Sequence, residues 1–210
     1  MQKLFSIISF VFLLLVQTLV CADNSVPKIL ILGDSLSAAY NIPIDKSWPE
    51  LFRTNIRASH PQSSVINASI SGETTFGGVQ RLEKLLEKHE PSHLIIELGG
   101  NDGLRGLKFA QSTANLSQMV TQAQQRDVPV MLIGVRMPPN FGPAYNARFQ
   151  QIFESISVQQ HVYYLPRFLE GVAASEASLM QNDGIHPTAE AQPILADKVL
   201  NTMLTVLSYP

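Results

Sequence analysis

The sequence predicts an α/β protein built around a parallel β-sheet. From Pro27 onward, short and continuously apolar runs alternate with longer amphipathic ones, which is typical of repeated βα units. The apolar runs lack a polar face, as expected for strands buried on both sides. The 210 residues, 45% of them hydrophobic, suit a single domain with a sizeable core.

The elements are expected to alternate along the chain in a regular order. The expected strands are short and aliphatic or β-branched: 28–32, 65–68, 94–98, 128–135 and 162–165. The expected helices follow them in turn: 48–58, 75–89, 111–125, 144–159 and 188–204. The second helix has the clearest period, because Val79, Leu82, Leu85 and Leu86 recur at helical spacing while charged residues occupy the opposite face.

A separate segment precedes the domain. Residues 4–16 form an uncharged apolar run of 13 residues after Lys3, and Val20 and Ala22 supply small residues at the −3 and −1 positions of a cleavage site. This three-part pattern predicts a secretory signal peptide over 1–22, cleaved after Ala22, with the domain spanning 23–210. The protein is then periplasmic or secreted, with no stable membrane insertion after cleavage.

Two alternatives to cleavage stay open. A retained anchor would need an apolar run of about 18 residues, which is longer than the one present. Lipidation of Cys21 is disfavoured because the branched Val20 precedes it.

Composition excludes several classes of function. After cleavage no cysteine remains, which excludes thiol catalysis and cysteine-based metal binding. The 15 Lys and Arg against 17 Asp and Glu give no basic footprint for nucleic acid. We therefore expect a monomer that acts on a small molecule, with no nucleic-acid partner.

A possible catalytic triad lies in loops at the carboxyl ends of strands, where open α/β sheets bind ligands. Ser35 directly follows the first strand, at a turn that would present its hydroxyl as a nucleophile for a neighbouring base. His186 can supply that base, and Asp183, three residues earlier, can orient the imidazole. The alternatives are a helix cap at 34–35 and a simple turn at 182–184.

Two further loop residues could stabilise an oxyanion. Gly72 has no side chain, so its N–H can approach a ligand, and Asn101 carries an amide NH₂ on the loop after the third strand. Each also fits an ordinary turn. All these residues are nevertheless expected at one edge of one sheet.

Four sequence blocks in this order resemble the SGNH (GDSL) hydrolases. They are GDSLS at 33–37, NASISG ending at Gly72, GGND at 99–102 and DGIHP at 183–187. From Lys28 to the end the chain is similar to the branch formed by the periplasmic thioesterases and lysophospholipases of Gram-negative bacteria.

The resemblance implies both a fold and roles for individual residues. The implied fold is a three-layer α/β/α sandwich of the flavodoxin-like type with a five-stranded parallel sheet. Ser35 is implied as the nucleophile, His186 as general base and then acid, and Asp183 as its orienting partner. The implied oxyanion hole consists of the Ser35 and Gly72 N–H groups and the Asn101 side chain. No metal and no organic cofactor are implied.

Apolar loop residues predict an acyl-binding site. Residues 103–109 place three large apolar side chains among glycines, a composition suited to a mobile flap. Residues after the fourth strand could form the opposite wall of the acyl-binding site, and one further candidate lies in the loop of His186. The candidate substrate-binding residues are Leu104, Leu107, Phe109, Met137, Phe141, Tyr145 and Ile185. Alternatively, some of them only anchor loops to the core.

The function predicted is that of a serine esterase acting through an acyl-serine intermediate. Its expected substrates are acyl esters and thioesters of medium to long chain: acyl-CoA-like thioesters, lysophospholipids and simple fatty-acyl esters. One alternative is a carbohydrate O-deacetylase of the same superfamily. A second is a non-enzymatic phosphate- or nucleotide-binding module, although GDSLSA at 33–38 lacks the glycine pattern of such loops.

Overall fold

The computed structural model describes residues 26–173 and 179–208. The predicted signal peptide and its cleavage site after Ala22 lie outside the described residues. No helix of 26–173 or 179–208 is long and apolar enough to cross a lipid bilayer.

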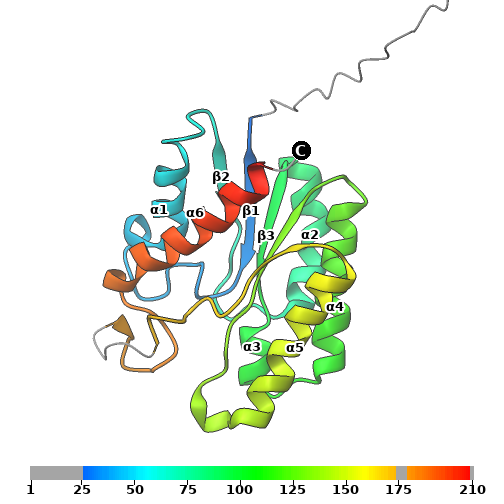
Figure 1. The fold of residues 1–210 in the computed structure, drawn as a ribbon, viewed down its shortest axis with the longest axis vertical. Coiled ribbons are helices and arrows are strands. Elements are labelled where there is room, and N and C mark those ends of the chain that lie inside the picture. The colour runs from blue at the N-terminus through cyan, green and yellow to red at the C-terminus, as the bar shows by residue number, and fades with distance from the viewer. Residues whose placement is uncertain (1–25, 174–178, 209–210) are drawn as a thin grey trace, which may run out of the picture.

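Five parallel strands form a single sheet at the centre of the domain (Figure 1). The strands are β1 (Lys28–Gly33), β2 (Ser64–Asn67), β3 (His93–Glu97), β4 (Val130–Ile133) and β5 (Tyr163–Leu165). Their spatial order is β2-β1-β3-β4-β5, which is the order of flavodoxin-like folds. The predicted five-stranded parallel sheet is therefore confirmed.

Helices cover both faces of the sheet, so the molecule has three layers. The helices are α1 (Trp48–Ile56), α2 (Thr75–His89), α3 (Gly100–Leu104), α4 (Phe109–Gln124), α5 (Pro143–Gln159) and α6 (Gln192–Ser208). Short 3-10 turns are η1 (Ile44–Lys46), η2 (Pro139–Phe141) and η4 (Ala189–Ala191). Figure 1 shows α1 and α6 on one face and α2, α4 and α5 on the other.

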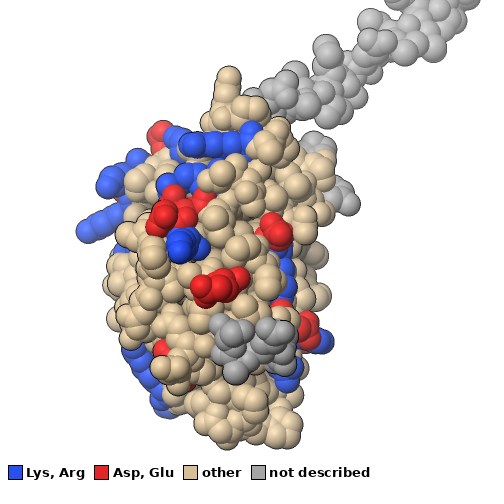
Figure 2. All heavy atoms as spheres, turned by 90° about the vertical axis from the view of Figure 1, so that its left-hand side faces the viewer, with Lys and Arg blue, Asp and Glu red and all other residues tan. Residues whose placement is uncertain are grey.

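The core lies between these layers. Residues 29–32 of β1 are completely buried, as are Trp48 and Phe52 of α1 on one face and Leu116 and Phe153 on the other. Burial of large apolar side chains on both faces of the sheet stabilises the sandwich. The face that carries α1 and α6 shows positive and negative side chains interspersed among uncharged ones (Figure 2).

Two segments differ from the expectation. The short helix α3 was not predicted, and it takes up Gly103 and Leu104, while Phe109 begins α4. Only residues 105–108 connect the two helices, so three of the seven residues of the expected flap over 103–109 belong to helix ends. The last helix was expected from residue 188, but η4 comes first and α6 begins at Gln192.

Candidate active site

The candidate site lies where the strand order of the sheet reverses. Strands β1 and β3 are neighbours, and their chain connections run to opposite sides. At such a switch point the loops after the two strands separate and leave a crevice at their carboxyl ends. Ser35 follows β1 and Asn101 follows β3, so both lie at this crevice.

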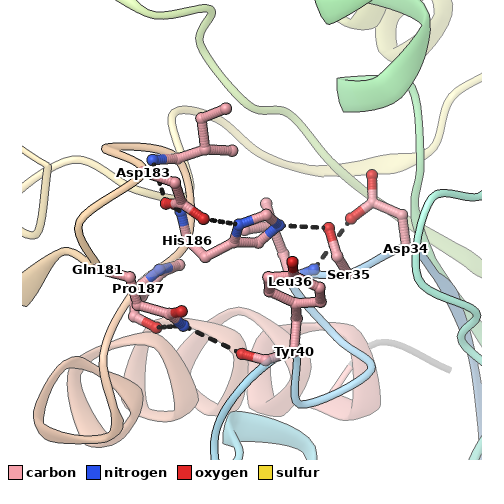
Figure 3. Close-up of polar contacts among 9 residues, drawn as sticks. Asp34, Ser35, Leu36, Tyr40, Gln181, Asp183, His186 and Pro187 are labelled. Atoms are coloured by element: carbon pink, nitrogen blue, oxygen red, sulfur yellow. Dashed lines mark hydrogen bonds and ion pairs between the residues drawn. The ribbon is translucent and has the colours of Figure 1, made fainter.

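The structure brings Ser35, His186 and Asp183 into one hydrogen-bonded chain (Figure 3). The His186 Nε2 atom lies 2.8 Å from the Ser35 Oγ atom, although 151 residues separate the two in sequence. The His186 Nδ1 atom lies 2.7 Å from the Asp183 Oδ2 atom. A carboxylate only accepts hydrogen bonds, so Nδ1 carries the imidazole proton and Nε2 is free to accept the serine proton.

Asp183 is held in its ionised form. Its Oδ1 atom accepts hydrogen bonds from the Ile185 and His186 main-chain N–H groups at 2.9 and 3.0 Å. Partial burial raises the pKa of Asp183, but these bonds and the bond from the His186 ring outweigh it, so the pKa lies below its ordinary value. The negative charge therefore remains beside the imidazole at neutral pH.

Contacts with Tyr40, in the loop that follows β1, hold the loop of His186 in place (Figure 3). The Gln181 Nε2 atom donates to the main-chain oxygens of both Tyr40 and Pro187, at 3.0 Å each. The Tyr40 ring lies against the His186 ring, with centroids 4.3 Å apart. These contacts hold the loop of His186 against the loop of Ser35.

The turn that carries Ser35 is fixed by a hydrogen bond within the turn, by one from α1 and by close packing on β1. The Leu36 N–H group donates to Asp34 Oδ1 at 3.0 Å, and Trp48 Nε1 of α1 donates to the Leu36 carbonyl at 3.0 Å. The turn also packs closely on the end of β1, because a Cβ atom at Gly33 would lie 2.7 Å from Ser37 Oγ. A glycine is therefore required at the first position of the GDSLS block.

The oxyanion-hole candidates lie on three different loops. The Asn101 Nδ2 atom donates to Asp34 Oδ2 at 3.0 Å, beside the serine turn. Gly72 has a φ of 79°, a left-handed conformation that favours glycine. The Arg105 guanidinium joins the other two loops, because its Nη2 atom donates to the Gly72 carbonyl at 3.0 Å and to Asn101 Oδ1 at 3.4 Å.

Two buried carboxyl groups lie beneath the serine turn, and the sequence pattern did not reveal them as a pair. Glu97, at the end of β3, is completely buried and accepts from Ser37 Oγ at 2.8 Å and from the Asp34 N–H group at 3.4 Å. Burial raises the pKa of Asp34 to about 6, and burial together with the Asp34 charge raises the pKa of Glu97 well above its ordinary value.

An apolar cavity of about 590 Å³ opens beside Ser35. Of the predicted substrate-binding residues, Leu104, Met137 and Ile185 line it, together with Ser35 and Asn101. The wall expected after the fourth strand is present in the loop after β4, whereas no signal in the sequence indicated the walls that Pro143 and Ala147 of α5 and the segment after β5 supply. The apolar members of these walls are Val135, Pro138, Pro139, Pro143, Ala147, Leu169, Ala173 and Met180.

Four predicted substrate-binding residues lie outside the cavity lining: Leu107, Phe109, Phe141 and Tyr145. Three of them pack on one another, with ring centroids 4.9 Å apart for Phe109 and Tyr145 and 5.2 Å apart for Phe141 and Tyr145. The Tyr145 hydroxyl donates to the Gly103 carbonyl at 2.7 Å. These aromatic residues therefore brace α3 and α4 against α5, whereas Leu107 is 43% exposed.

No three His, Cys, Asp or Glu side chains within 26–173 and 179–208 are grouped so as to hold a metal ion. The chemistry that this site offers is instead that of an oriented serine, histidine and aspartate beside an apolar cavity. A hydroxyl bonded to a carboxylate-oriented imidazole, at the switch point of a flavodoxin-like sheet, has the arrangement found in serine hydrolases.

Comparison with known proteins also identifies the chain as a hydrolase. The model of the GDSL-like lipase/acylhydrolase family matches residues 31–193. The chain belongs to this family of hydrolases, as the four sequence blocks predicted.

Individual relatives cover almost the whole chain. An arylesterase of Vibrio mimicus is 41% identical over 192 residues, which are 91% of this chain and 96% of that protein. The thioesterase 1/protease 1/lysophospholipase L1 of Escherichia coli K12 is 39% identical over 200 residues, covering 95% of this chain and 93% of that protein. The crystal structure of TesA superposes with a TM-score of 0.82 at 40% identity, covering 86% of this chain and 99% of TesA.

Proposed function

We propose that the protein hydrolyses acyl esters and thioesters through an acyl-enzyme intermediate on Ser35. The observation that carries this proposal is the 2.8 Å contact between His186 Nε2 and Ser35 Oγ at the wall of an apolar cavity. A nucleophile bonded to its base beside an apolar pocket is suited to acyl transfer from a substrate with a hydrocarbon chain.

In the first half-reaction, Ser35 Oγ attacks the acyl carbonyl carbon while its proton passes to His186 Nε2. The Ser35 and Gly72 N–H groups and the Asn101 amide stabilise the negative oxygen of the tetrahedral intermediate. When the intermediate collapses, the bond to the alcohol or thiol breaks and His186 protonates that leaving group. Asp183 stabilises the imidazolium that forms in between.

In the second half-reaction, water replaces the alcohol or thiol. His186 accepts a proton from water as the water oxygen attacks the acyl carbon, and the same oxyanion donors stabilise the second tetrahedral intermediate. Ser35 Oγ leaves and takes the proton back from His186. The products are the free acid and the original enzyme, with no cofactor consumed.

The lining of the cavity favours a fatty-acyl substrate over an acetylated sugar. Its walls are mainly Leu, Met, Val, Pro and Ala side chains, which bind hydrocarbon better than hydroxyl groups. The names of the arylesterase and of the thioesterase/lysophospholipase relatives support the same substrate classes: simple esters, thioesters and lysophospholipids.

The central test is a Ser35→Ala variant. We expect it to lose hydrolysis of aryl esters by a factor of about 10⁴ or more, because no other group supplies the nucleophile, while its thermal unfolding stays close to that of the wild type. A fluorophosphonate probe is expected to modify the wild type at Ser35, located by peptide mapping, and to leave the variant unmodified. Near-normal hydrolysis by the variant, or labelling at another serine, would overturn the proposal.

A series of aryl esters from acetyl to palmitoyl tests the substrate class. The value of kcat/KM is expected to rise from acetyl to medium-chain esters because each added methylene enters the apolar cavity. A carbohydrate O-deacetylase would instead be fastest on the acetyl ester and on acetylated sugars. A protein that only binds phosphate or a nucleotide would show no turnover at all.

We also infer that the chain is exported to the periplasm or secreted, and that it acts as a monomer on small molecules rather than on nucleic acid. The charge and cleavage pattern of residues 1–22 supports export. The near balance of acidic and basic residues supports the absence of a nucleic-acid partner.

A further inference from the structure

We propose that Arg105 is a positioning residue that holds Gly72 and Asn101 in the relative positions that they need as oxyanion donors. The inference deepens the proposed function and rests on it. No sequence block of the family contributes Arg105 to the predicted site, and its side chain is exposed at the end of α3. Its role follows from the two loops that it joins.

One nitrogen of Arg105 bridges two loops that are distant in sequence. The Nη2 atom donates to the Gly72 carbonyl at 3.0 Å and to Asn101 Oδ1 at 3.4 Å. Gly72 belongs to the loop after β2, and Asn101 lies in the first turn of α3, the helix after β3. An oxyanion hole built from both loops needs them at a fixed separation, because its donors must converge on one oxygen atom.

Arg105 also fixes which end of the Asn101 amide faces the serine turn. The amide nitrogen donates to Asp34 Oδ2 at 3.0 Å, while the amide oxygen accepts from Arg105. Rotating the amide by half a turn would place its oxygen against a carboxylate and its NH₂ group against a guanidinium. Both contacts would be repulsive, so the amide keeps one orientation and its second N–H stays available for the oxyanion.

The bond to Gly72 restrains a backbone that is otherwise permissive. Gly72 has a φ of 79° and no side chain to limit its rotation. A hydrogen bond from a guanidinium to its carbonyl therefore restricts the conformations of the residue whose N–H is to meet the substrate. Arg105 itself needs no contact with the substrate to have this effect.

Donors of an oxyanion hole act mainly in the transition state, so their misplacement lowers kcat more than it raises KM. Loss of one such donor typically costs about 10²–10³ in kcat. Loss of a residue that only positions the donors should cost less. For Arg105→Ala we expect kcat to fall about tenfold on a short-chain aryl ester, with KM changed less than twofold and the thermal unfolding midpoint unchanged.

Lys108→Ala is the matched control. Lys108 is an exposed cation three residues further along the same segment, and neither Gly72 nor Asn101 accepts a hydrogen bond from its side chain among the described residues. Its removal changes the net charge equally. We expect kcat to stay within twofold of the wild type for this variant. A loss equal to that of Arg105→Ala would show that positive charge alone matters and would overturn the positioning role.

A double-mutant cycle with Asn101→Ala completes the test. If Arg105 acts through Asn101 and Gly72, its replacement in the Asn101→Ala background should cost about threefold or less, which is the part carried by Gly72. An equal loss in both backgrounds, or a kcat for Arg105→Ala within twofold of the wild type, would overturn the inference. Ser35→Ala is assayed in parallel, because hydrolysis by that variant would overturn the proposed function instead.

Discussion

Glu97, which lies beneath the candidate site, is expected to make the stability of the protein depend on pH. It is completely buried on β3, and its Oε1 atom has no hydrogen-bond partner among the described residues. Burial, reinforced by the nearby Asp34 charge, raises its pKa well above the ordinary value. Glu97 therefore keeps its proton to a higher pH than an ordinary glutamate does, while the Asp34 carboxylate accepts the hydrogen bond that orients Asn101.

The sign of the resulting stability change follows from proton linkage. Both carboxyl pKa values are raised in the folded protein, so the native state keeps protons that the unfolded chain has already lost. The free energy of unfolding therefore falls as the pH rises above the ordinary values of 3.8 for Asp34 and 4.5 for Glu97. The Asp34 contribution falls until about pH 6, where its folded pKa lies, and the Glu97 contribution falls until the pH reaches that group's own raised pKa.

A Glu97→Gln variant tests this linkage. Glutamine keeps an acceptor for Ser37 and Asp34 but cannot ionise. Each raised carboxyl contributes a slope of at most about 1.4 kcal/mol per pH unit. We expect the decline in unfolding free energy from pH 4.5 upward, measured by urea denaturation, to be shallower in the variant by up to that amount.

Exposed Glu154 provides the comparison, since Glu154→Gln should leave the slope unchanged. If Glu97→Gln shows the same pH dependence as the wild type, Glu97 does not carry the proton assigned to it.

At the scale of elements, one buried aspartate joins three helices beside Asn101, the candidate oxyanion donor. Asp102 of α3 accepts hydrogen bonds from the Thr75 N–H group at 2.9 Å and the Thr75 hydroxyl at 2.5 Å, both at the start of α2. It also accepts from Ser112 Oγ of α4 at 3.0 Å. A helix of five residues has little stability of its own, so α3 and the neighbouring Asn101 depend on these bonds.

Replacing Asp102 by alanine should therefore destabilise the fold strongly. Three buried donors would lose their acceptor, and each such loss costs about 1–3 kcal/mol. We expect a loss of roughly 3 kcal/mol or more in unfolding free energy by urea denaturation, with a lower kcat in the fraction that remains folded. Asp45→Ala, at an exposed position of η1, should change stability by less than about 0.5 kcal/mol. Similar losses in the two variants would contradict this role for Asp102.

At the scale of the whole molecule, the strand order brings the site together. Because the connections after β1 and β3 run to opposite sides of the sheet, the serine turn and the loop of Asn101 frame one crevice. The chain after β5 then returns to the same edge and brings the His186 loop onto Ser35. Residues far apart in sequence thus form one site without any need for a second domain.

The charge and cleavage pattern of residues 1–22 leads to a prediction about the mature protein. When the full chain is expressed in a Gram-negative host, we expect a soluble periplasmic product whose N-terminus, found by Edman sequencing or intact mass, is Asp23. Changing Ala22 to a bulky residue should block processing. Recovery of the uncleaved chain in the membrane fraction would instead support a retained anchor.

The sequence by itself determined the fold class and indicated where the candidate site lies. Continuous apolar runs are a local pattern that specifies buried parallel strands, and the blocks around Ser35, Gly72, Asn101 and His186 fall in the loops after them. A parallel sheet places the loops that leave its strands at one edge, so the meeting of these residues could be predicted from their order.

Only the tertiary structure decided which side chains face the cavity and which support it. Phe109 and Tyr145 have the composition of an acyl-binding wall, yet they pack on each other to brace α3 and α4 against α5. The roles of Arg105 and Glu97 could not be read from the sequence, since they depend on Gly72 for Arg105 and on Asp34 for Glu97, each of which lies in a distant loop. The physical reason is that burial and side-chain direction are set by packing between distant elements, which a local pattern does not contain.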